Sequence, residues 1–186
     1  MLPHPARDVE IAVKASADGL DLRAIATLNI LAWGGQVDEA TVHKRAKKLE
    51  TRIASVPPDR QGMVVAAVSG QMVGYCRIVQ DKVDESCWWL EGLIVHPAHR
   101  RRGVGRTAVH GAIAYAAARG ATRIRSETHA DNLPSIAFHE KLGFRNDGVF
   151  TAADGDRQVA FLLPLAGSQL PGTNGKWTHR RGARGG

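Results

Sequence analysis

The residues best suited to chemistry form one basic run with two glycines: Val95-His96-Pro97-Ala98-His99-Arg100-Arg101-Arg102-Gly103-Val104-Gly105-Arg106. An apolar, strand-like segment at 88–95 leads into this run, and a helical pattern at 104–118 leads out of it. The first N–H groups of a helix have no partner within the helix, and the helix dipole favours an anion there. Gly103 and Gly105 carry no Cβ, so a phosphate can approach the backbone closely. With four arginines around the turn, the run predicts a pyrophosphate cradle.

Two other phosphate-binding motifs fit this run poorly. A P-loop requires Gly-x-x-x-x-Gly-Lys-Ser/Thr, and the sequence contains no such string. A dinucleotide fingerprint requires Gly-x-Gly-x-x-Gly after the first strand of a βαβ unit, whereas Arg100-x-x-Gly103-x-Gly105 lies in the middle of the chain. The remaining alternative is a glycine turn with a solvated basic face.

A second informative segment follows: Asn132-Leu133-Pro134-Ser135-Ile136-Ala137-Phe138-His139-Glu140-Lys141-Leu142-Gly143-Phe144. Together the two segments resemble the GNAT superfamily of acetyl-CoA-dependent N-acetyltransferases, whose acetyl-CoA signature matches Arg100-x-x-Gly103-x-Gly105. The spacing Ser-x-x-x-His-x-x-x-Gly-Phe in the second segment is most similar to aminoglycoside 6'-N-acetyltransferase-like members. The resemblance covers residues 63–165.

Hydrophobic periodicity and turn signals divide the chain into strands and helices. They predict helices after Asp18 or Asp21 and at 38–55, 104–118 and 133–141, and strands at 9–13, 63–68, 72–80, 87–95, 123–128, 145–152 and 158–163. The order is β-α-α-β-β-β-α-β-α-β-β. The resemblance implies an α/β (α+β) GNAT fold, with a central, mixed, mostly antiparallel sheet of six to seven strands and four helices. Residues 1–165 are expected to form a single acetyltransferase domain, and 166–186 a basic, disordered tail.

The resemblance implies acetyl-CoA as a co-substrate and no metal. In this family the pantetheine arm pairs with a strand through its amides, and the matching strand end here is Leu93-Ile94-Val95. Asn132 matches a family position that contacts the same arm, although an Asn before a helix is also a good N-cap. The other cofactor residues expected are Arg100, Arg101, Arg102, Gly103, Val104, Gly105, Arg106, Ser135, His139 and Lys141.

Acetyl transfer to an amine needs a base for the amine and an acid for the leaving thiolate. The candidate bases are Glu127, five residues before Asn132, and Glu91, inside a strand; Glu127 is slightly preferred. A Glu inside a strand is also explained by a salt bridge to a neighbouring strand. His139 stands where many relatives have a tyrosine acid, and it either donates a proton or is satisfied locally on its helix.

Aromatic and acidic groups are the candidates for holding the acceptor. Clustered carboxylates would attract a polycationic amine, whereas the competing explanation is that Asp-rich loops serve turns. The substrate-binding candidates are Trp33, Asp81, Asp84, Glu85, Trp89, Glu91, Asp154 and Asp156.

Composition narrows the classes of protein further. The 186 residues suit one domain, no apolar run reaches the length of a membrane span, and the N-terminus lacks a secretory apolar region, so a cytoplasmic protein is expected. Cys76 and Cys87 are expected to be buried thiols. The net charge of +7 suggests a nucleic-acid partner, but residues 176–186 hold four of the basic groups, which disfavours it. A homodimer remains open.

The favoured function is transfer of acetyl from acetyl-CoA to a primary amine of a small polycationic molecule, an aminoglycoside-like antibiotic. The alternatives are acetylation of a protein N-terminal amine of the ribosomal-protein type, a non-catalytic acyl-CoA-binding regulator, and a nucleic-acid-binding module led by the basic tail.

Overall fold

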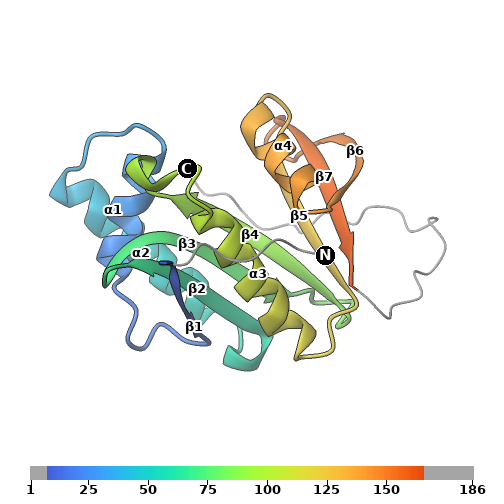
Figure 1. Ribbon diagram of the computed structural model, residues 1–186, viewed down its shortest axis with the longest axis horizontal. Helices are drawn as coiled ribbons and strands as arrows, with labels where there is room; N and C mark the ends of the chain where they lie inside the picture. Colours follow the sequence, from blue (N-terminus) through green and yellow to red (C-terminus); the bar gives the residue numbers. More distant parts are fainter. Residues whose placement is uncertain (1–7, 166–186) are drawn as a thin grey trace. The chain divides into compact units, whose positions relative to one another are not determined.

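The computed structural model describes residues 8–165, so the tail expected at 166–186 lies outside the described residues. The chain runs in order through β1 (Glu10–Lys14), α1 (Leu22–Ala32), α2 (Glu39–Ala54), β2 (Gln61–Val68), β3 (Gln71–Gln80), β4 (Cys87–Val95), α3 (Val104–Ala117), β5 (Arg123–His129), α4 (Leu133–Lys141), β6 (Arg145–Thr151) and β7 (Arg157–Pro164) (Figure 1). Short 3₁₀ turns, η1 (Pro58–Arg60) and η2 (Pro97–His99), precede β2 and α3. The predicted α/β class and element order are confirmed.

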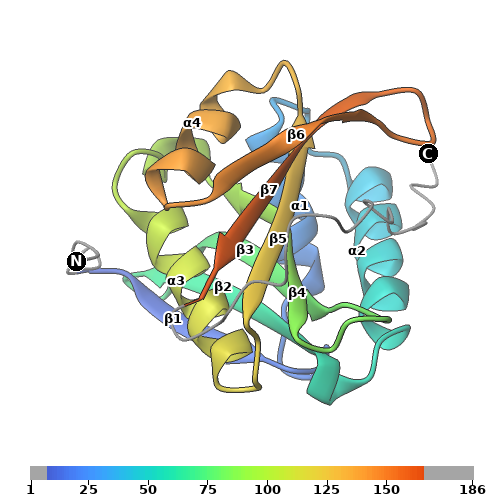
Figure 2. The same ribbon diagram turned by 90° about the vertical axis from the view of Figure 1, so that its right-hand side faces the viewer.

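The described residues form two compact units, one ending at Ala121 and the other beginning at Thr122. The single domain expected over residues 1–165 therefore stays a prediction. In the first unit, β1, β2, β3 and β4 pair in sequence order, and each pairing is antiparallel. α3 packs on β1 to β4, whereas α1 packs on β3 and β4 from the other side of the sheet (Figure 2).

Small residues let α3 approach its face of the sheet closely. A Cβ at Gly74 would lie 2.9 Å from Cγ1 of Val104, and one at Gly62 would lie 2.7 Å from the Tyr115 ring. The Cys76 thiol, on the same face as Gly74, lies 3.8 Å from the carbonyl oxygen of Ala108. Because side chains alternate along a strand, the odd-numbered residues of β3 face the opposite side, towards α1 and α2.

Local signals in the sequence explain where the first helices and strands begin. Asp21, one of the two predicted caps of the first helix, accepts a hydrogen bond from the backbone N–H of Ala24. Asp38, at the predicted start of the second helix, accepts one from Thr41 and is its N-cap. The β2–β3 hairpin turns at Ser69 and Gly70, which both have positive φ. β2 begins at Gln61, two residues earlier than predicted, because the polar Gln61 is buried with its amide bonded to two carbonyl groups of the preceding segment.

In the second unit, β7 lies between β5 and β6 and pairs with both in antiparallel fashion. α4 packs on β6, and Ile124, Phe144 and Phe161 are buried in this unit. Cys76 and Cys87 of the first unit are both buried, as expected. Within residues 8–165, no helix is long and apolar enough to cross a membrane.

Candidate active site

The turn from β4 into α3 has the geometry of an anion cradle. Arg101 and Gly103 both have positive φ, 62° and 85°, and Gly103 is the N-cap of α3. The N-termini of α1, α2 and α4 each carry a side-chain cap, but α3 has none. The first N–H groups of α3 are therefore left for a ligand or water, at the positive end of the helix dipole.

The four arginines of this turn do not share one role. The guanidinium of Arg100 donates to the carbonyl oxygen of Ala32, at the C-terminal end of α1, over 2.5 Å, and to that of Val95 over 3.4 Å. Arg101 and Arg102 are exposed, and Arg106 is half-buried. Arg100 thus ties the turn to α1, while the other three remain the better candidates for binding a phosphate.

Strand β4 contains a bulge next to its predicted cofactor-binding end. Tyr75 of β3 is opposite Ile94 and Arg77 is opposite Glu91, so three residue steps on β4 match two on β3. Gly92, at φ 60°, provides the left-handed conformation within this bulge. The extra residue interrupts the β3–β4 ladder between Glu91 and Ile94, next to the segment where the resemblance places the pantetheine arm. Sequence reasoning missed this role of Gly92, although a glycine inside a strand pattern is a recognised signal of a bulge.

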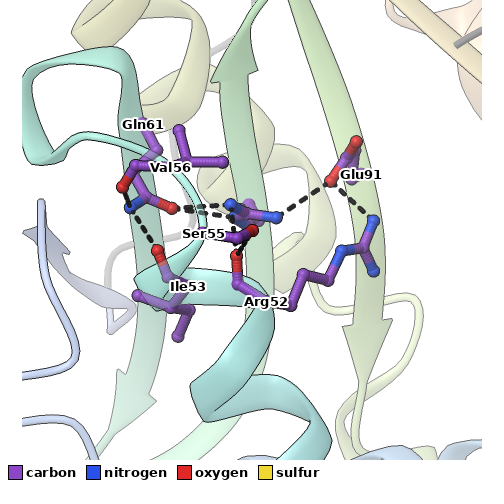
Figure 3. Close-up of polar contacts among 7 residues, drawn as sticks. Arg52, Ile53, Ser55, Val56, Gln61 and Glu91 are labelled. Carbon is purple, nitrogen blue, oxygen red and sulfur yellow. Dashed lines mark hydrogen bonds and ion pairs between the residues drawn. The ribbon is translucent and has the colours of Figure 1, made fainter. Parts of the chain in front are cut away.

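Glu91 lies within a buried polar network on the α1 and α2 side of the sheet. Figure 3 shows its carboxylate between two guanidinium groups, one of them from Arg52 of α2 at 2.7 Å. The other belongs to Arg77 of β3, at 3.4 Å. Arg77 also donates to the side-chain oxygen of Gln61 over 2.7 and 3.1 Å and to the carbonyl oxygen of Arg52 over 3.2 Å. The amide of Gln61 in turn donates to the carbonyl groups of Ile53 and Val56.

This network joins α2, β2, β3 and β4 around one carboxylate. The Glu91 side chain is 16% exposed and that of Arg77 only 4%, so the pair is largely removed from water. The geometry matches the structural explanation for a Glu inside a strand, a salt bridge to its neighbours. The assignment of Glu91 as a base or substrate contact stays a prediction.

Most acidic candidates of the β3–β4 loop have structural partners. Asp81 accepts hydrogen bonds from the N–H groups of Val83 and Asp84 and from the Trp89 indole at 2.7 Å. Asp84 accepts from the N–H and hydroxyl of Ser86, and Glu85 pairs with Arg60. These are the turn contacts that the competing explanation expected. Trp33, by contrast, is 66% exposed just after α1.

The second unit carries the other sequence-predicted residues. Glu127 is exposed on β5, and Asn132 caps α4 by accepting from the N–H of Ser135 at 3.2 Å. Lys141 is exposed at the last turn of α4, whereas Ser135 is half-buried. The cap explains Asn132 locally, and its contact with the cofactor arm stays a prediction.

His139 is enclosed in the core of the second unit. Its Nδ1 lies 2.7 Å from the Ser135 carbonyl oxygen and therefore carries the proton, which leaves Nε2 to accept from the Ser126 hydroxyl at 3.0 Å. The ring stacks on Phe161 with centroids 4.6 Å apart. Burial lowers the pKa of His139, although the Ser135 bond opposes this shift. These contacts match a histidine satisfied locally on its helix, and the proton-donor role stays a prediction.

The β6–β7 turn and the end of β5 border a pocket of about 310 Å³ in the second unit, lined by His129, Ala130, Asp131, Asp156 and Arg157. Asp154 accepts from the N–H of Asp156 and so shapes the turn. Asp156 lies 3.7 Å from Nδ1 of His129. Of the two predicted acidic residues in this turn, Asp156 lines this pocket and Asp154 does not. Sequence reasoning missed His129 and Asp131, which belong to no recognised motif.

An α/β fold with a bulged strand, a basic turn and an uncapped helix N-terminus is suited to a phosphate-bearing ligand. Residues 24–144, more than half of the chain, match the acetyltransferase (GNAT) family. The chain therefore belongs to this family, and the resemblance drawn from its two sequence segments is confirmed. Among residues 8–165, no group of three or more His, Cys, Asp or Glu side chains is arranged to hold a metal.

Relatives of known sequence include two antibiotic acetyltransferases. The chain is 32% identical over 87 residues to aminoglycoside N(6')-acetyltransferase type 1 of Klebsiella aerogenes, which covers 44% of this chain and 57% of that protein. It is 27% identical over 116 residues to streptothricin acetyltransferase of Streptomyces lavendulae, which covers 57% of this chain and 59% of that protein. The matches thus span little more than half the length of these relatives.

Two solved structures show the same fold. The ribosomal-protein-S18-alanine N-acetyltransferase from Escherichia coli has a TM-score of 0.63 at 22% identity, covering 88% of this chain and 99% of that one. The PaiA N-acetyltransferase from Thermoplasma acidophilum, in complex with coenzyme A, has a TM-score of 0.62 at 18% identity, covering 82% of this chain and 97% of that one. At these identities the likeness concerns the fold alone.

Proposed function

We propose that this protein transfers the acetyl group of acetyl-CoA to a primary amine. The observation that carries the proposal is the uncapped N-terminus of α3 behind the Arg101–Gly103 turn, in a chain of the GNAT family. Its N–H groups, with Arg101, Arg102 and Arg106, would bind the pyrophosphate. The segment Leu93–Val95, at the end of the strand that follows the bulge, would pair with the pantetheine arm, and acetyl-CoA would supply the thioester.

Glu127 would receive the proton of the acceptor amine. It is exposed on β5, five residues before the cap of α4, and a carboxylate there can act directly or through a water. Glu91 is the weaker candidate because its carboxylate is already bound by two guanidinium groups. A base held in a double ion pair must give up part of that interaction whenever it takes a proton.

The acceptor class we propose is a small polycationic amine of the aminoglycoside type. Two relatives bear the names of aminoglycoside and streptothricin acetyltransferases, which supports an antibiotic amine. The pocket in the second unit offers two carboxylates, Asp131 and Asp156, to a cationic ligand. The β3–β4 loop contributes less than expected, since Asp81, Asp84 and Glu85 are engaged in turn contacts and an ion pair.

Because the carboxylates of the β3–β4 loop already have partners, a second candidate acceptor is favoured, the N-terminal amine of a protein. A peptide acceptor carries one ammonium group and does not require a dense acidic surface. Trp33, 66% exposed after α1, offers an apolar contact that suits a peptide as well as a sugar.

A thiol-release assay with acetyl-CoA separates these candidates. The acceptors are a panel of aminoglycosides, a streptothricin, linear polyamines and N-terminal peptides. We expect turnover of at least one aminoglycoside with a KM that rises with salt, because exposed charges are screened. Gly105→Val serves as the control that should lose activity with every acceptor. Turnover of peptides alone would support the second candidate, and acetyl-CoA binding without any turnover would support a non-catalytic regulator.

A further inference from the structure

The pocket in the second unit contains a histidine that the proposed reaction does not yet use. His129 is the last residue of β5 and lies opposite Gln158 of β7 in the antiparallel ladder. Its side chain is 38% exposed at the wall of the pocket. Along β5, Ser126 and Thr128 are buried, whereas Glu127 is exposed and His129 is half-buried. His129 and Glu127 therefore share the more open face of this strand.

Two side chains of different chemistry converge on Nδ1 of His129. The amide nitrogen of Gln158 lies 3.2 Å from it, and a carboxylate oxygen of Asp156 lies 3.7 Å from it. Gln158 is 1% exposed, so its amide is held in place by its surroundings. Its side-chain oxygen is buried and has no hydrogen-bond partner among the described residues.

This arrangement accommodates both protonation states of the imidazole. When Nδ1 is unprotonated, it accepts a hydrogen bond from the Gln158 amide. When Nδ1 carries a proton, Asp156 supplies the opposite charge, and a turn of the Gln158 amide presents its unpartnered oxygen as the acceptor.

The proposed reaction releases a proton that such a residue can carry. An ammonium ion and a thioester yield an amide, a thiol and one proton: two N–H bonds of the ammonium group break, a C–N bond forms, and the C–S bond is replaced by an S–H bond. The thiolate takes up one of the two protons that nitrogen loses, so one proton must leave the site in each turnover. Glu127 and His129 are two residues apart on one strand face, about 7 Å along the strand, so their side chains are neighbours on that face.

We propose that His129, held by Gln158 and Asp156, receives the proton that Glu127 takes from the acceptor amine and passes it to solvent at the pocket. This inference rests on the proposed function and adds the route by which the proton leaves. The other charged groups at the pocket are Asp131, which follows β5, and Arg157 of β7. Glu127 and Arg125 are the charged neighbours on β5 itself.

The test compares His129→Ala and His129→Gln with wild type, and with His43→Gln as a matched control on exposed α2 surface. kcat and KM are measured with the best acceptor from pH 6 to 9, with and without added imidazole. We expect kcat of His129→Ala to fall about tenfold, the acceptor KM to change less than twofold, and imidazole to restore most of the rate. Asp156→Asn should lower kcat less than His129→Ala does, and its acceptor KM should rise because Asp156 is also a proposed acceptor contact. His43→Gln should behave as wild type.

Two results would overturn the inference while leaving the proposed function intact. One is a wild-type kcat in both His129 variants at every pH. The other is a rise in the acceptor KM of both His129 variants that imidazole does not reverse, which would make His129 an acceptor contact. Lack of wild-type turnover with every amine would instead overturn the proposed function together with the inference. If His129→Ala does not fold, judged by its thermal melting curve, the near-isosteric His129→Gln decides the outcome through its pH profile.

Discussion

Replacing Glu91 by glutamine should destabilise the fold strongly because it leaves a buried cation without its carboxylate partner. The Arg77 side chain is 4% exposed, and the substitution leaves it the neutral oxygens of Gln61 and Arg52 while removing the Glu91 carboxylate. Removing one partner of a buried ion pair costs about 3–5 kcal/mol. The 3.4 Å separation and the 16% exposure of Glu91 place the expected loss at the lower end, about 3 kcal/mol.

The control is the exposed partner of the same carboxylate. Arg52 is 55% exposed, so Arg52→Met should cost only about 0–1 kcal/mol, the range of surface pairs. Combining Glu91→Gln with Arg77→Met removes both buried charges together. The double variant should therefore be more stable than the sum of the single effects predicts, by about 2 kcal/mol.

Urea denaturation at neutral pH measures the stability of wild type, Glu91→Gln, Arg52→Met, Arg77→Met and the double variant. A thiol-release assay on the folded variants adds the catalytic readout. A loss below about 1 kcal/mol for Glu91→Gln, or additive single effects, would refute the assignment of Arg77 as a buried cation that depends on Glu91. If folded Glu91→Gln also loses about two orders of magnitude in kcat, Glu91 rather than Glu127 is the base.

Three further results follow from the site. Gly105→Val should place a branched side chain where the phosphate approaches and weaken acetyl-CoA binding at least tenfold, about 1.4 kcal/mol, by calorimetry; unchanged affinity in a folded variant would reject the cradle. Glu127→Gln should lower kcat by about two orders of magnitude in the thiol-release assay, and His139→Ala should lower it less because a thiolate leaves readily. A nearly silent Glu127→Gln would end its assignment as base. Burial lowers the pKa of His139, so below about pH 6.5 the unfolded chain binds a proton that the folded chain excludes. The free energy of unfolding therefore decreases as the pH is lowered. His139→Gln should flatten this fall in urea midpoints between about pH 7 and 5, and an unchanged slope would contradict a buried neutral ring.

Much of the fold could be predicted because its signals are local. Asp21 and Asp38 cap helices within three residues of themselves, and α4 has the predicted bounds between Asn132 and Leu142. The pyrophosphate cradle could be predicted for the same reason, because the strand, the glycine turn and the start of the helix are consecutive in the chain. The start of β2 at Gln61 could not be predicted, because the partners of this side chain are carbonyl groups at the end of the preceding helix. No sequence pattern distinguishes such a buried polar residue from a loop residue.

By itself the sequence determined the family, the order of elements and the basic turn in front of α3, since each depends on neighbours within a few positions. Only the tertiary structure decided how the side chains are used. It pairs the Glu91 carboxylate with Arg52, 39 residues away, and the Arg100 guanidinium with the carbonyl oxygen of Ala32, 68 residues away. It also brought Asp156 and Gln158 of the closing hairpin to His129. These pairings follow from strand register and from the approach of α2 to the sheet. The type of each residue therefore did not predict which partner it would have in the folded chain.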